Sequence, residues 1–129
     1  MIPLTREQIL NAEHEELDIL VAVHVMGWRV FDSSILTFIT DSGKYITREL
    51  TSYGSFMPSE DISSAWTVVE KMGEKDCWMT IHYGPDEQAG GEPTYFVEVV
   101  NPCLPDVCAD TAPLAICRAA LLAKLEEAE

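Results

Sequence analysis

The chain has 129 residues, 47% hydrophobic and 23% charged, so a single globular domain over residues 1–129 is expected. The formal net charge is −14, which disfavours binding to nucleic-acid duplexes and to anionic membranes. The longest apolar run, Ile19–Met26, is too short to span a bilayer, and residues 1–16 lack the apolar core of a signal peptide.

The N-terminal part of the chain predicts a short helical turn and then a longer helix. Thr5, with Gln8 three positions later, has the pattern of a capping box. The longer helix is predicted from about residue 15 to residue 26, and Gly27 suits its C-terminal cap. His24 lies on the apolar stripe of this helix, where a packed histidine is expected more often than a ligand.

A β-hairpin is predicted next. Residues 34–40 and 45–50 are rich in β-branched and aromatic side chains, and residues 41–44 have turn composition around Gly43. Residues 51–58 are predicted to form a loop.

The second half of the chain predicts helix, hairpin and helix. A helix is predicted over about 59–73, with Ser59 or Asp61 as its cap. Two strands, over 77–83 and 94–101, are predicted to flank a polar loop, and a last helix begins near residue 110. The order helix-hairpin-helix-hairpin-helix predicts the α+β class, with an antiparallel sheet and helices on its faces. One apolar residue from each of four elements is predicted to be buried: Leu20, Trp66, Val97 and Leu121.

Signatures of catalysis and of metal binding are missing from the sequence. The four cysteines lack zinc-knuckle spacing and the three histidines are scattered, so reduced thiols, no metal and no cofactor are expected. No phosphate-binding loop, dinucleotide fingerprint, nucleophile elbow or zinc-protease motif is present. A non-enzymatic protein is therefore expected, although Cys77 or Cys117 could still meet His82 in space.

Three blocks of the sequence, residues 25–28, 59–72 and 109–122, resemble the phage ABA sandwich family. The resemblance runs from about Ile9 to Leu125 and implies a small protein of tailed phages and prophages, acting in the host cytoplasm. It also implies an α/β/α sandwich, with helices on both faces of an antiparallel sheet, and it brings no catalytic residues. The chain departs from the family at Glu13-His14, in place of the usual Pro-Gly, and by an inserted hairpin at about 31–57.

Three functions remain open at this point. The first is sequestration of a small anionic ligand, such as a host immune nucleotide signal. The second is inhibition of a host defence or replication protein through the acidic surface, and the third is degradation of a small molecule. Residues suited to stack on a base or to hold a phosphate are the candidates for the first function: Trp28, Lys44, Tyr45, Arg48, Tyr53, Asp110, Thr111 and Arg118.

Each of these candidate residues could also have a purely structural role. Trp28 can be a core aromatic, and Asp110 and Thr111 can simply cap the last helix. The inserted hairpin can extend the sheet or contact a second copy of the chain, so a homo-oligomer is also open.

Overall fold

A computed structural model describes residues 4–32, 37–40, 43, 45–47, 56–86, 91–101 and 103–128. The fold begins with α1 (Arg6–Asn11), α2 (His14–Leu20) and the π-helical turn η1 (Val21–Val25), followed by β1 (Arg29–Asp32), β2 (Thr37–Ile39) and β3 (Tyr45–Thr47). It continues with α3 (Ile62–Gly73), β4 (Trp78–Asp86), β5 (Glu92–Val100), β6 (Val107–Ala109) and α4 (Ala112–Ala128). The predicted α+β class is confirmed. The predicted short N-terminal helix is confirmed as α1, because the Thr5 hydroxyl caps it by accepting from the Gln8 N–H at 3.1 Å. The structure adds β1 and β6 to the predicted elements.

Helix α4 lies at the centre of the molecule. Its residues from Ala115 to Ala123 are buried except for Arg118, and it contacts α1, α2, η1, α3, β5 and β6. Its many alanines leave room for neighbouring elements on several sides, so the helix fills the core instead of covering one face of it.

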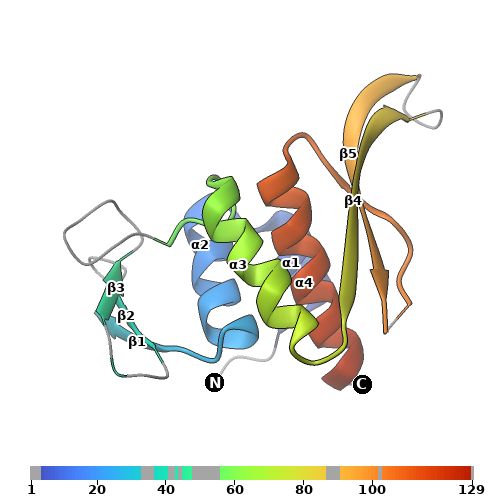
Figure 1. The fold of residues 1–129 in the computed structure, drawn as a ribbon. Helices are drawn as coiled ribbons and strands as arrows, with labels where there is room; N and C mark the ends of the chain where they lie inside the picture. Colours follow the sequence, from blue (N-terminus) through green and yellow to red (C-terminus); the bar gives the residue numbers. More distant parts are fainter. Residues whose placement is uncertain are drawn as a thin grey trace.

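Two three-stranded antiparallel sheets lie on opposite sides of the helices (Figure 1). Strands β4 and β5 pair from Trp78↔Val100 to Asp86↔Glu92, and β6 pairs with β5. The other sheet has the order β1-β2-β3, and its β2–β3 pairing confirms the predicted first hairpin.

The β4–β6 sheet has helices on one face in the described part of the chain. Val97 and Val99 are buried toward α4, whereas Glu98 and Val100 are exposed on the other side. The expected helices on both faces are therefore not seen among the described residues. The outward positions include polar residues such as Thr80 and Glu98, which allow that face to contact water.

The predicted core is correct at three of its four positions. Leu20, Val97 and Leu121 are buried, but Trp66 is 51% exposed. Helix α3 instead buries Ala65, Val68 and Met72. The prediction for Trp66 was wrong because α3 has two adjacent apolar faces, and the face with the smaller side chains packs against α4.

Candidate functional site

The clearest candidate site is an open hollow beside Trp28, between η1 and the start of α3. It measures about 510 Å³ and is lined by Met26, Trp28, Phe56, Asp61, Ser63, Ser64 and Thr67. We call it the Trp28 hollow. Its size lies within the range of small-molecule sites, roughly 300–1,000 Å³.

Trp28 is positioned by the end of the first helical segment. Gly27 adopts φ +75, a left-handed conformation that glycine takes without steric cost. This turn lets the Trp28 N–H donate a 2.9 Å hydrogen bond to the Ala22 carbonyl. The partly buried Trp28 ring then lies 4.7 Å, centroid to centroid, from the buried Phe56 ring and 6.5 Å from Phe38.

The polar side of the Trp28 hollow comes from the first turns of α3. The Asp61 carboxylate caps the helix by accepting hydrogen bonds from the Ser64 N–H at 3.2 Å and from the Ser64 hydroxyl at 3.0 Å. Ser63 is exposed, and the Thr67 hydroxyl donates to the Ser64 carbonyl at 2.6 Å. The hollow therefore offers an aromatic wall, hydroxyl groups and one carboxylate.

Most of the hairpin residues predicted for the site lie outside the described residues. Lys44, Arg48 and Tyr53 belong to this group. The backbone of Tyr45 is described in β3, where it pairs with Ile39, but its side chain is not. Their predicted grouping with Trp28 therefore stays a prediction.

The predicted residues of the last helix lie elsewhere. Thr111 caps α4, because its hydroxyl accepts from the Leu114 N–H at 3.4 Å, and Asp110 is exposed before it. This cap leaves the helix with fewer free N–H groups for an anion. Trp28 and Arg118 line separate hollows, so the described structure does not bring them together.

Arg118 lines a second open hollow of about 430 Å³, together with Ala12, Glu13, His14, Glu15, Glu60 and Leu114. Its Nε is buried without a hydrogen-bond partner in the described part of the chain. Three glutamates share this hollow with Arg118 and His14, which makes it a poor site for a multiply charged phosphate.

A polar cluster that the sequence did not predict lies next to the second hollow. Asp18 and Ser59 are fully buried, and the Ser59 N–H donates to Asp18 Oδ1 at 2.8 Å. The Ser59 hydroxyl is 3.1 Å from His14 Nδ1. The carboxylate contacts the serine backbone rather than the imidazole, and the hydroxyl is inaccessible, so this cluster lacks the geometry of a catalytic triad.

Two of the four thiols are buried in the structure. None of the four cysteines forms a disulfide among the described residues, and Cys77 and Cys117 are buried. Burial, and secondarily the charge of Asp18, raises the pKa of the Cys117 thiol well above its usual value, which keeps the thiol neutral. His82 lies five positions beyond Cys77 along an extended strand, or roughly 16 Å away, so these two residues cannot form a dyad.

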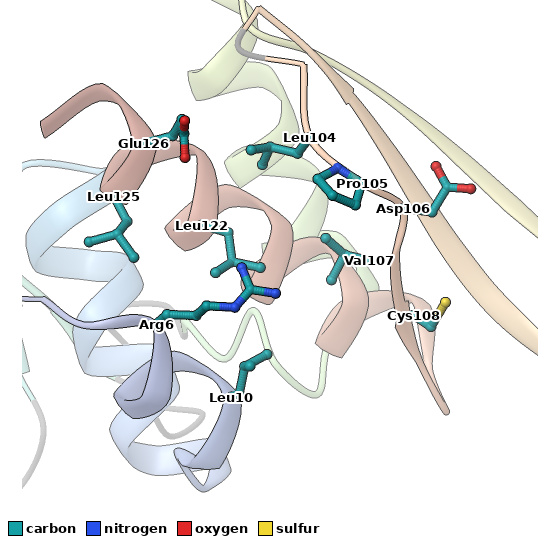
Figure 2. A pocket seen from close by; sticks show the side chains of 10 residues that line it. All are labelled: Arg6, Leu10, Leu104, Pro105, Asp106, Val107, Cys108, Leu122, Leu125 and Glu126. Atoms are coloured by element: carbon teal, nitrogen blue, oxygen red, sulfur yellow. The ribbon is translucent and has the colours of Figure 1, made fainter. Parts of the chain in front are cut away.

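A third hollow, more enclosed than the other two, lies between α1, α4 and the segment before β6 (Figure 2). It holds about 170 Å³, which is small for a nucleotide. Figure 2 shows the Arg6 side chain extending toward Leu122 across an apolar floor, while Asp106 and Glu126 lie at the rim. The sequence contained no signal for this hollow, because its lining comes from distant segments.

Within the described ranges, the structure offers neither a metal-binding cluster nor a membrane-spanning helix. No group of three or more histidine, cysteine, aspartate or glutamate side chains is close enough to hold a metal ion. No helix among the same residues is long and apolar enough to cross a membrane.

The described residues combine helices with two short antiparallel sheets. The chain matches the Phage ABA sandwich domain family over residues 19–121, and it belongs to this family. It is therefore a small phage protein. No curated protein and no solved structure is significantly similar to it.

Proposed function

We propose that the protein is a non-enzymatic phage accessory protein that sequesters a small, ring-bearing anionic ligand in the host cytoplasm. A nucleotide signal of host immunity is the ligand class that fits best, which would make the protein an anti-defence sponge. The observation that carries the proposal is the Trp28 hollow, where a partly exposed indole lies beside hydroxyl groups of α3.

The lining of the hollow defines how such a ligand would lie. A base would stack on Trp28, a contact worth roughly 1–3 kcal/mol, and its edge would face Ser63 and Thr67. The Asp61 carboxylate would repel a phosphate on the α3 side. The phosphates would therefore point toward the hairpin, where Lys44 and Arg48 are the predicted cations.

The absence of catalysis is part of the same proposal. Ser59 is fully buried, and the raised pKa of Cys117 keeps its thiol protonated, so neither is a ready nucleophile. The alternative of an enzyme that degrades a small molecule has no comparable support from the described residues.

Tryptophan fluorescence provides a direct test, because the chain has only three tryptophans. Replacing Trp66 and Trp78 by phenylalanine leaves Trp28 as the only reporter. Adenosine and guanosine monophosphates and cyclic dinucleotides are titrated, and at least one is expected to quench this signal saturably. Trp28→Ala and Ser63→Asp in the natural background should weaken binding by about tenfold or more in calorimetry.

Tyr83→Ala is the matched control, since Tyr83 is an exposed aromatic outside the hollow. Binding that survives Trp28→Ala and Ser63→Asp, or no binding by any nucleotide, would reject the proposal. Intact binding by the Tyr83 variant shows that the loss is specific to the hollow.

A second candidate function is inhibition of a host protein through direct contact. Two exposed tryptophans, Trp66 and Trp78, favour it, because tryptophan is enriched among the residues that dominate protein interfaces.

A further inference from the structure

An exposed apolar stripe runs along α3 and onto the edge of the β4–β6 sheet. Its exposed members are Ile62, Trp66, Trp78 and Val100, and the half-buried Val69 and Gly73 connect them along α3. Ile62 and Trp66 are each 51% exposed, and Trp78 and Val100 are 56% and 48% exposed. Single exposed apolar residues are ordinary on a protein surface, but connected ones that include two tryptophans are not.

The stripe is continuous across two elements. Ile62, Trp66, Val69 and Gly73 follow one another at spacings of three or four residues, which places them along one side of the helix. A Cβ atom at Gly73 would lie 3.3 Å from the Trp78 ring, so Trp78 packs against the last turn of α3. Trp78 in turn pairs with Val100 across β4 and β5.

The exposed members of the stripe, Ile62 and Trp66 on α3, are not part of the core, whereas Val69 is partly buried against it. Helix α3 contacts the core through Ala65, Val68 and Met72, which are all buried. The stripe also differs from the Trp28 hollow, because Ser63 is rotated about 100° from Ile62 around the helix. Sequence periodicity alone had assigned Trp66 to the core, and its exposure is the observation that needs an explanation.

Exposed charges around the stripe are mostly acidic. Glu70, Glu74 and Asp76 lie beside it on and after α3, and Glu98 lies next to Val100 on β5. Two lysines interrupt this rim, Lys71 and Lys75, and Lys71 Nζ is 3.5 Å from the Glu74 carboxylate. The local excess of acid has the same sign as the net charge of the whole chain, −14.

We infer that the stripe docks a second protein whose contact surface has an apolar centre surrounded by lysine and arginine. Charge complementarity selects this occupant. A second copy of the chain would bring the same acidic rim and would be repelled, and a phosphate backbone or an anionic bilayer would be repelled as well. The inference goes beyond the proposed ligand binding and uses a different surface.

The first stage of the test locates the partner. A photoreactive benzoylphenylalanine is placed at Ile62 in the full chain, and at Tyr83 as an exposed control outside the stripe. Both forms are irradiated in cells of a phage host. The Ile62 form is expected to cross-link a host or phage protein that the Tyr83 form does not. No adduct specific to Ile62, or an adduct with a second copy of the chain, would overturn the inference.

The second stage measures binding with the purified cross-linked protein as the probe. Trp66→Ala and Ile62→Lys should each weaken binding by about 30-fold, and Tyr83→Ala should leave it unchanged. Raising salt from about 50 to about 500 mM should also weaken it, as should Glu70→Lys. Binding that tolerates both stripe substitutions, or that strengthens with salt, would contradict the proposal.

Both stripe substitutions lie at exposed positions and should therefore leave the fold intact. The melting temperature of each variant checks this independently of binding. Nucleotide binding at the Trp28 hollow should persist in the Ile62→Lys variant. Failure of this inference can thus be distinguished from failure of the proposed ligand binding.

Discussion

The backbone N–H of Ser59 donates a 2.8 Å hydrogen bond to Oδ1 of Asp18, and both residues are completely buried. The contact joins α2 to the turn that precedes α3, 41 positions further along the chain. It fixes the segment from which the Trp28 hollow and the second hollow both take residues. A buried N–H that loses its acceptor keeps the full cost of its desolvation.

We expect Asp18→Ala to lower the free energy of unfolding by about 1–3 kcal/mol, since the Ser59 N–H would lose this acceptor. Asp18→Asn retains a carbonyl oxygen and should cost less. Urea denaturation measures both, with the exposed Asp106→Ala as the control. Equal stabilities for the alanine variant and the natural protein would contradict the role given to Asp18.

The stability of the protein should fall at alkaline pH because of Cys117. Burial first, and the nearby Asp18 charge second, raise the pKa of this thiol above its ordinary value of 9.0. The unfolded chain therefore releases the thiol proton at lower pH than the folded chain. Below about pH 9 the stabilisation is complete, and it is lost as the pH rises toward the higher folded pKa.

The slope from this one group is at most about 1.4 kcal/mol per pH unit. Denaturation curves at about pH 8, 9 and 10 should show it in the natural protein. In Cys117→Ala the decline should be shallower by this contribution. Identical slopes in the two proteins would show that the thiol does not titrate differently on unfolding.

Trp66 and Leu121 should respond in opposite ways to truncation. Trp66 is 51% exposed, so Trp66→Ala should change the free energy of unfolding by less than about 1 kcal/mol. Leu121 is fully buried in α4, and Leu121→Ala should cost about 2–5 kcal/mol. Thermal melts of the two variants side by side provide the measurement. A large loss for Trp66→Ala would place its ring in the core after all.

Gly27 and Gly84 offer a matched pair for testing the turn before Trp28. Neither glycine has an atom within 4 Å of an added Cβ, but only Gly27 has a positive φ, +75. Gly27→Ala should therefore destabilise the protein by about 1–2 kcal/mol, while Gly84→Ala should have little effect. If both variants melt alike, the left-handed turn is not what positions Trp28.

Local patterns in the sequence predicted the strongest elements and missed those that depend on the tertiary fold. The hairpin of β4 and β5 was expected because two β-prone segments flank a Gly- and Pro-rich loop. The three-residue strand β6 has no such signal and exists because β5 has an open edge beside it. The helix predicted through residue 26 is α-helical only to Leu20 and then widens into η1.

The candidate site was predictable to a similar extent. Trp28 could be proposed from its chemistry, but its neighbour Phe56 lies 28 positions away, and no periodicity connects them. The Asp18–Ser59 contact could not be predicted either, because the two residues lie 41 positions apart and no pattern in the sequence connects them. The burial of Trp66 was mispredicted because periodicity locates an apolar face of α3 but cannot choose between two adjoining faces.

The central position of α4 has a consequence for how the chain could be divided. Helix α4 ends the described chain, and six elements that precede it contact it directly: α1, α2, η1, α3, β5 and β6. A fragment of residues 1–110 would expose the apolar side chains that normally pack against α4, and it should fail to fold cooperatively. A separate peptide carrying α4 should restore the native circular dichroism when added to this fragment, which is the result expected of a split protein that assembles by complementation.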